Sequence, residues 1–531
     1  SVAAAQNNDS DVTITSSNGN AVNVAQSGSS NDSDVIVGTS SDRNSLNVGQ
    51  AGTQNMSTVK AKADANRNLL LSGQTGTKNR SNVLVRNSNA NGMALGQSGT
   101  RNKSDIDITG DSNRNAMGIS QAGMRNESYV DIDDNSNANV IGVSQAGSDN
   151  YAYAEAYDDS NSNLMAVSQG GSDNYAEVEI YYSSNANAVG VSQGGSDNYA
   201  YVEVYEDSNA NAVGVSQGGS GNEAEVEIYY SSNANAVGVS QGGSDNDSYV
   251  YIDDDSNTNY VGTTQNGSNN ESGVDIEEES NDNVVALLQA GSGNELDMEG
   301  SNGIKYSSSY NFVAVSQAGT DNATEIEIED DSDWNFVAVS QAGSDNDSEV
   351  EIYNNSDNND VAVTEVGNDN SSLVTLDANS DNNMVSVSQD ADDNDSWVSA
   401  FNADDNMVDV SQSGDSNISV VLLLPSADGN DVSVTQSGDD NAAVSWNGFD
   451  SDDNVVSITQ MGEFSLAISA NVLGASDNEA TITQGPNTVG NLALAVSAGD
   501  FNETEIYQDG FVNAAASLQV GDENEAGITQ L

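Results

Sequence analysis

The fold is decided by residues 187–211, whose sequence is NAVGVSQGGSDNYAYVEVYEDSNAN. In the first half, up to Gln193, Asn and Val alternate with Ala, Gly and Ser, and a Gly-Gly-Ser-Asp turn follows. In the second half, from Asn198 to Tyr205, Ala and Val alternate with Tyr and Glu. Strict alternation over short runs bounded by turn residues predicts two β-strands, each with one buried face.

The same pattern recurs along the whole chain. The motif Gln-x-Gly-x-x-Asn occurs 17 times in phase, mostly at steps of 24 residues, and degenerate copies lie in phase with it at Glu365, Gln389, Gln460, Gln484 and Gln530. An Asn stands six residues before each motif position, so every period contains two turns rich in Ser, Asn, Asp and Gly. The 22 copies leave no gap for a linker, and residues 1–531 are interpreted as a single repeat array.

Two strands of this length cannot enclose a core by themselves. Stacking the repeats lets each strand bond to its copies above and below at ~4.8 Å, while two sheets face each other across a thin core. The prediction is an all-β, amyloid-like β-solenoid of about 22 stacked 24-residue strand-turn-strand rungs, with two facing, parallel, in-register sheets.

In-register stacking also predicts ladders of side-chain amides along the axis, as in cross-β assemblies. A motif glycine suits a turn position that needs positive φ or a close backbone approach. These residues are interpreted as structural, because an amide repeated in every rung is not a catalytic group. The predicted ladder residues of the central repeats are Gln145, Gly147, Asn150, Asn163, Gln169, Gly171, Asn174, Asn187, Gln193, Gly195, Asn198, Asn211, Gln217, Gly219 and Asn222.

The composition excludes several classes of protein. The chain has 531 residues with no Cys and no His, which rules out disulfides, thiolate nucleophiles, His-based triads and His-ligated zinc. The net charge of −71 argues against nucleic-acid binding, which needs a basic surface. No stretch approaches the ~18 apolar residues of a membrane-spanning helix. Because the sequence starts at Ser1 without an apolar leader, it is interpreted as a mature, processed product.

The unit resembles the curlin repeat of bacterial curli fibre subunits, Ser-x5-Gln-x-Gly-x-x-Asn-x-Ala-x3-Gln. Gln169, Gly171, Asn174 and Ala176 match the central half of that repeat, and Asn478-x-Ala480-x3-Gln484 and Asn524-x-Ala526-x3-Gln530 match its closing half. The departures are an Asn in place of the first Ser, an Ile or Val in place of the second Gln in most repeats, and the 24-residue period.

The resemblance implies an extracellular, cell-surface, amyloid-like fibre in the biofilm matrix. It implies self-association into a homopolymer, export through a dedicated outer-membrane pore, and a nucleator of curli type as a further partner. From the composition we expect no enzymatic activity and no cofactor, apart from Ca²⁺ or other divalent cations on the acidic face.

The two predicted sheets differ in their outward residues. The first strand points small residues outward, such as Ala188, Gly190 and Ser192, whereas the second points acids and tyrosines outward, such as Glu177 and Glu179. Two interpretations of the acidic face stay open. It provides solubility and prevents lateral sheet growth, or it binds Ca²⁺ or other divalent cations or adapts the protein to high salt. No compact Ca²⁺-loop signature is present, so the metal ligands are unknown.

Charge is polarised along the chain. Eleven of the twelve basic residues lie between Arg43 and Arg125, so the weakly basic residues 1–125 carry a net +2 and the strongly acidic residues 126–531 carry −73. The exception is Lys305, in a rung with a four-residue insertion at 295–310, which is interpreted as a tolerated surface bulge or a binding loop.

The two ends of the chain are expected to form the polymer interface. The first residues enter the alternating pattern almost at once, and the last ones stop within a rung, so an unpaired sheet edge is expected at each end. Completion by β-strand addition from the next molecule predicts a polar, head-to-tail filament. The interface residues are predicted to be Val2, Ala4, Gln6, Ala526, Ile528 and Gln530.

Three classes of function are weighed against these features. The leading hypothesis is a secreted structural subunit of a curli-like fibre. The alternative is a monomeric surface adhesin or a cation- or ice-binding β-solenoid, although the Ala, Gly and Ser of the first strand differ from the Thr arrays of ice-binding solenoids. An enzyme such as a polysaccharide lyase is the least favoured, because residues 126–531 contain one Lys and no Arg beside their carboxylates.

Overall fold

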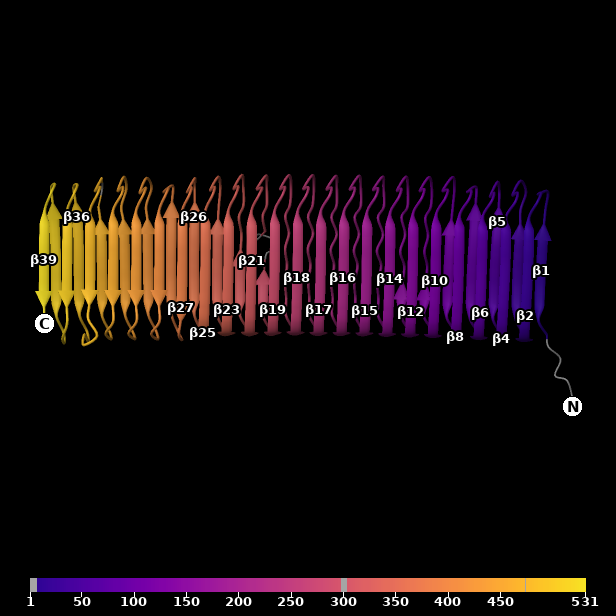
Figure 1. The fold of residues 1–531 in the computed structure, drawn as a ribbon, viewed down its shortest axis with the longest axis horizontal. Helices are drawn as coiled ribbons and strands as arrows, with labels where there is room; N and C mark the ends of the chain where they lie inside the picture. The colour runs from indigo at the N-terminus through magenta and orange to yellow at the C-terminus, as the bar shows by residue number, and fades with distance from the viewer. Residues whose placement is uncertain (1–6, 298–302, 473) are drawn as a thin grey trace, which may run out of the picture. The chain divides into compact units, whose positions relative to one another are not determined.

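The computed structural model describes residues 7–297, 303–472 and 474–531. Among these residues there is no helix, and parallel, in-register sheets form a β-solenoid, which confirms the predicted fold class. The chain divides into two compact units, Ser1–Asn259 and Tyr260–Leu531, which are described separately. Within each unit the strands lie side by side with turns at both ends (Figure 1).

In the first unit, one sheet contains the motif glutamines and is named the glutamine sheet. Its strands are β2 (Ala21–Ser29), β4 (Ser45–Thr53), β6 (Leu69–Thr77), β8 (Gly92–Thr100), β10 (Ala116–Met124), β12 (Val140–Ser148), β14 (Leu164–Ser172), β15 (Ala188–Ser196), β16 (Ala212–Ser220) and β17 (Ala236–Ser244). The facing sheet is named the second sheet. Its strands are β1 (Asp9–Ile14), β3 (Asp32–Val37), β5 (Met56–Lys62), β7 (Arg80–Arg86), β9 (Lys103–Ile108), β11 (Glu127–Ser128) and β13 (Tyr151–Ala152).

The second unit has the same two sheets. The glutamine sheet consists of β18 (Tyr260–Ser268), β19 (Val284–Ser292), β21 (Phe312–Thr320), β23 (Phe336–Ser344), β25 (Asp360–Asn368), β27 (Met384–Asp390), β29 (Met407–Gln412), β31 (Asp431–Gln436), β33 (Val455–Gln460), β35 (Glu479–Gln484), β37 (Glu503–Gln508) and β39 (Glu525–Gln530). The second sheet consists of β20 (Glu295–Asp297), β22 (Ala323–Ile326), β24 (Asp347–Ile352), β26 (Ser371–Asp377), β28 (Asp395–Phe401), β30 (Ile418–Leu423), β32 (Ala442–Asn447), β34 (Leu466–Asn471), β36 (Leu492–Ala498) and β38 (Ala514–Val520).

The core lies between the two sheets and follows the predicted alternation. Val189 and Val191 of β15 are buried, and so are Val202 and Val204 of the facing segment. Strands pair with their equivalents one repeat away, so that Gln169 of β14 stands beside Gln193 of β15. Each rung therefore buries its apolar side chains against the facing sheet and against neighbouring rungs, as expected for a solenoid.

The prediction of a regular second strand is wrong for the central repeats. After β13, the segments that include residues 198–205 and 222–230 bury their inward side chains but are not β-strands. Several β-branched residues of the equivalent segments have positive φ, a strained region for such side chains. In the repeat before residues 198–205, φ is 110° at Val178 and 114° at Ile180. Carboxylates repeat on the outward face in consecutive rungs here, and like charges directly opposite one another destabilise a regular ladder.

Candidate functional site

The motif glutamines form a hydrogen-bonded ladder inside each unit, which is continuous in the first unit and interrupted at Glu365 in the second. The side-chain Nε2 of each glutamine donates to Oε1 of the glutamine in the next rung, at 2.8 Å from Gln145 to Gln169, 2.9 Å from Gln169 to Gln193 and 2.9 Å from Gln193 to Gln217. These side chains are almost completely buried. Because a buried amide without a partner is costly, each rung satisfies the polar groups of the next.

Two asparagine ladders border the turns. On the motif side, Nδ2 of Asn174 donates to Oδ1 of Asn150 at 2.9 Å, and Asn198 and Asn222 repeat this contact at 2.8 and 3.0 Å. On the other side, the backbone N–H groups of Asn187 and Asn211 each donate at 2.8 Å to Oδ1 of the asparagine one rung before, Asn163 and Asn187. The asparagines thus hold both ends of these rungs in register.

The motif glycines lie where one turn meets the next. Gly147, Gly171, Gly195 and Gly219 have φ between 105° and 114°. A Cβ placed on Gly195 would lie 1.9 Å from the carbonyl oxygen of Gly219. Only glycine fits this position, both because of its φ and because of the close backbone approach.

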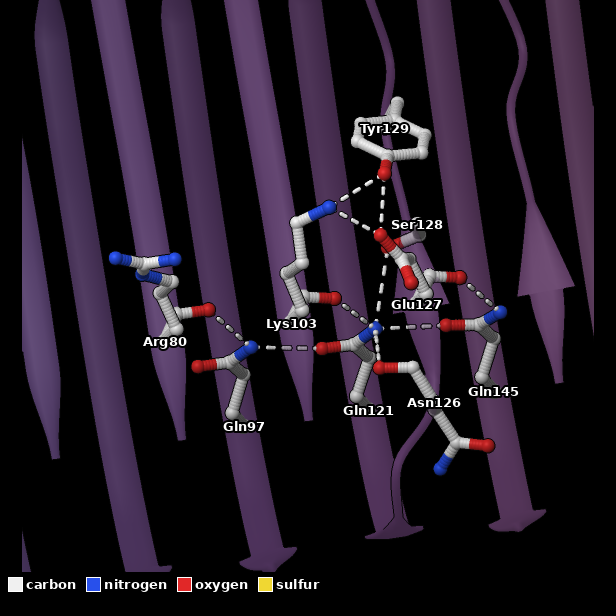
Figure 2. A network of polar contacts seen from close by, with 9 residues as sticks. All are labelled: Arg80, Gln97, Lys103, Gln121, Asn126, Glu127, Ser128, Tyr129 and Gln145. Atoms are coloured by element: carbon white, nitrogen blue, oxygen red, sulfur yellow. Dashed lines mark hydrogen bonds and ion pairs between the residues drawn. The ribbon is translucent and has the colours of Figure 1, made fainter. Parts of the chain in front are cut away.

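Figure 2 shows how one glutamine connects the two sheets. Nε2 of Gln121 lies 2.8 Å from Oε1 of Gln145, 2.7 Å from the Lys103 carbonyl oxygen of the second sheet, and 3.1 Å from the Asn126 carbonyl oxygen. Above it, the Lys103 ammonium group pairs with Glu127 and with the Tyr129 hydroxyl group. Around Gln121 the interior ladder is neutral, and the charges lie outside it.

Carboxylates spaced 24 residues apart in the first unit form a set that we name the carboxylate column, and three of them, Glu155, Glu179 and Glu227, are buried. Burial, with the charges of neighbouring carboxylates, raises the pKa of Asp107 to about 6 and that of Asp131 to about 7. The same causes raise the pKa values of Glu179 and Glu227, and each has one buried oxygen without a hydrogen-bond partner among the described residues. The carboxylate column has one member in each repeat: Asp107, Asp131, Glu155, Glu179, Glu203 and Glu227.

Tyrosines accompany the carboxylates on this face, as the outward pattern predicts. Tyr151, Tyr175 and Tyr199 stack with ring centroids 4.9 and 5.0 Å apart, and the Tyr175 hydroxyl group donates to Glu177. Opposite, the outward side of the glutamine sheet is uncharged between β8 and β15 and forms a shallow trough of about 820 Å³ that includes Gly142 and Ser144. Among the described residues, no group of three or more Asp or Glu is arranged to hold a metal ion.

The insertion at 295–310 lies partly outside the described residues. In its described part, Ile304 is buried and the Lys305 ammonium group pairs with Glu327. Both partners of this pair are largely buried, unlike Arg125, whose guanidinium group is more than half exposed beside Asp149. Lys305 therefore neutralises part of the acidic face locally.

The predicted polymer interface is described at one end only, because Val2, Ala4 and Gln6 lie outside the described residues. At the other end, Ala526, Ile528 and Gln530 point inward from β39, which pairs with β37. All three are only half-buried, whereas their equivalents in β37, such as Ile506, are fully buried. Among the described residues, the pairing given for β39 is with β37 alone.

Two features of the structure go beyond what the sequence pattern predicted. Glu365 enters that pattern only as a degenerate motif residue, although a carboxyl group in an amide ladder signals a titratable site. The outward residues of β30, β32, β34, β36 and β38 are apolar, whereas the central repeats predicted acids and tyrosines on this sheet. The signal for this change was the run of alternating apolar residues at Ile418 to Leu423 and at Leu492 to Val496.

Comparison with known proteins agrees with this architecture. No helix of the described residues is long and apolar enough to cross a membrane. No curated protein sequence matches the chain significantly. The Curlin associated repeat matches three segments of the second unit, residues 380–414, 403–438 and 499–531. These matches, together with the in-register Gln and Asn ladders, support a curlin-repeat assignment for the chain.

Proposed function

We propose that this protein is the structural subunit of an extracellular curli-like fibre that polymerises head to tail by β-strand addition. The family and the β-solenoid fold point to a structural protein. The observation that carries the proposal is the half-buried inward face of β39, where Ile528 and Gln530 present a ladder that a further rung would continue. A strand with a free edge is a template for pairing with another chain.

The first unit offers a matching edge. β1 pairs with β3 in the described residues, and its Val12 and Ile14 are each 49% exposed. The net charges of +2 for residues 1–125 and −73 for the remainder support docking of the first rungs of one copy on the last rungs of another. Such a fibre belongs outside the cell, in matrix and adhesion, with export through an outer-membrane pore and a curli-type nucleator as expected partners.

The test compares two substitutions in β39 of the full chain. Ile528→Asp places a charge on the inward side of the free edge, whereas Thr529→Asp places the same charge on the outward side. We expect the first variant to remain folded by circular dichroism but to elongate at least ~10-fold more slowly, because its edge can no longer accept an apolar rung. The second variant should elongate normally. Filament length is read by negative-stain electron microscopy.

The proposal fails if the unaltered protein stays monomeric at high concentration in low and high salt, with and without divalent cations. That result would favour a monomeric adhesin. It also fails if Ile528→Asp elongates as fast as Thr529→Asp, because growth would then use another surface.

A further inference from the structure

In the second sheet of the second unit, the outward side chains change from acidic on the first strands to apolar on the last strands. On β24 the outward residues include Glu349 and Glu351. On β30, β32, β34, β36 and β38 the outward residues are only Ala, Val, Leu, Ile and Trp, and these five strands contain no charged residue. We name the outward surface of these five strands the apolar face.

The apolar face is continuous because the strands pair in register. One column runs through Val420, Val444, Ile468 and Leu494. Trp446 is 42% exposed, and Leu518 and Val520 are more than 70% exposed. Large contiguous apolar patches are rare on the surfaces of monomeric proteins and mark interaction sites.

The inward side of the same strands is unusually polar. Ser445, Ser469 and Ser497 are buried, and their hydroxyl groups have no hydrogen-bond partner among the described residues. The larger apolar side chains therefore point away from the core, although burying them would stabilise the fold by ~25 cal/mol per Å². These outward side chains contribute the free energy of apolar burial only when a partner covers the face.

The surrounding charges restrict the partner. The outward residues of the opposite sheet in these rungs include Asp409, Glu479 and Glu505. Residues 306–531 contain no Lys or Arg. An anionic membrane or a nucleic acid would need basic residues at the rim, so the partner has an apolar surface of its own.

We propose that the apolar face docks against the same face of a second copy of this chain. Five strands at ~4.8 Å spacing and about six residues at ~3.3 Å give a face of about 480 Å². Two such faces bury about 1,000 Å² together, which reaches the lower limit of a specific interface. Two sheets packed in this way lie ~10 Å apart, with their side chains interdigitated.

This lateral contact is separate from head-to-tail growth, because it uses the face of a sheet and not its edge. It predicts that two solenoids associate side by side. Acidic turns adjoin the face on both copies, so salt should strengthen the contact by screening their repulsion over the ~10 Å Debye length at 0.1 M.

The experiment uses the full chain carrying Ile528→Asp, so that elongation does not obscure pairing. To this background we add either Ile468→Glu with Leu494→Glu, on the apolar face, or Ser457→Glu with Thr481→Glu, on the outward side of the glutamine sheet. Each pair adds two charges at register partners in neighbouring rungs. Sedimentation velocity at increasing concentration and salt then gives the dimer dissociation constant.

We expect the background protein and the Ser457/Thr481 control to dimerise, and the Ile468/Leu494 variant to dimerise at least ~100-fold more weakly, because burial of unpaired charges costs several kcal/mol. Dimers that persist in the Ile468/Leu494 variant would overturn the proposal. So would loss of β-structure in that variant, which would make these positions core residues. A background protein that stays monomeric but binds phosphatidylcholine vesicles through this face would also overturn it, in favour of a lipid surface. Failure of head-to-tail growth is detected independently, by the β39 variants without changes on the face.

Discussion

Gln341 donates its side-chain Nε2 hydrogen to Oε2 of Glu365 across 3.0 Å, at the rung where a carboxyl group replaces the ladder amide. Glu365 is fully buried, and its Oε1 has no hydrogen-bond partner among the described residues. On the next rung, Oε1 of Gln389 accepts a hydrogen bond from the Ser372 hydroxyl group at 3.0 Å. Because a carboxylate has no hydrogen to donate, the amide ladder is interrupted between Glu365 and Gln389.

Glu365→Gln should repair this interruption. The new amide can donate to Gln389, and the buried negative charge is removed, so we expect the local free energy of unfolding to rise by about 1–3 kcal/mol at pH 8. Because unfolding of a repeat array need not be two-state, the measurement is amide hydrogen exchange at β25 and β27. The reverse change, Gln341→Glu, should weaken protection. Lower protection in Glu365→Gln would contradict the prediction.

The same site should make stability depend on pH. Burial, together with the charge of Asp347, raises the pKa of Glu365 to about 7, against the hydrogen bond from Gln341 that lowers it. A pKa raised in the folded state means that stability is fully present below the unfolded value of ~4.3 and is lost as the pH rises through about 7. Protection of these rungs should therefore decrease between pH 4 and pH 8 in the wild-type protein. The difference from Glu365→Gln should nearly vanish at pH 4.

The carboxylate column should act in the same direction on the first unit. Its raised pKa values, about 6 for Asp107 and about 7 for Asp131, mean that the folded state binds protons more tightly than the unfolded state. Lowering the pH from 8 to 5 should stabilise this unit, as read by hydrogen exchange at β9 to β13. Asp131→Asn should remove part of that dependence. A first unit that becomes less protected on acidification over this range would contradict the prediction.

The motif glycines should be intolerant of any side chain. Gly195→Ala forces a Cβ to within 1.9 Å of the Gly219 carbonyl oxygen at a φ of 107°, and should cost about 2–5 kcal/mol locally. Gly190 of the same strand is the control, because a Cβ added there meets nothing within 4 Å. Gly190→Ala should leave the protection of neighbouring rungs unchanged, and equal effects of the two changes would refute the explanation.

A charge in the core should act locally. Val191 is 2% exposed, and Val191→Asp should cost about 2–5 kcal/mol in its own and adjacent rungs. Ser192→Asp, on the exposed side of the same strand, should be nearly neutral. Because each rung contacts only its neighbours, distant rungs should keep their protection. Loss of all β-structure from Val191→Asp would show that the array folds as one cooperative unit.

The sequence by itself determined the repeat, the strand-turn-strand rung and the parallel, in-register stacking. These follow from local rules, since period-two alternation specifies which side chains point inward, and a spacing of 24 residues places Gln169 beside Gln193. The glycine positions were predictable for the same reason, because only the absence of a Cβ allows adjacent turns to approach so closely.

Only the tertiary structure decided the properties that depend on what surrounds a residue. The strained backbone at Val178 and Ile180 lies within a segment whose sequence alternates as that of a strand does. Carboxylates of consecutive rungs lie beside it. The raised pKa of Glu365 comes from its burial between two sheets. In β34 and β36, alternation predicts that successive side chains point to opposite faces of the sheet. The facing sheet decides that Ser469 lies on the inner face and Leu494 on the outer face. Local alternation specifies two faces, and only the packing of the sheets assigns one of them to the interior.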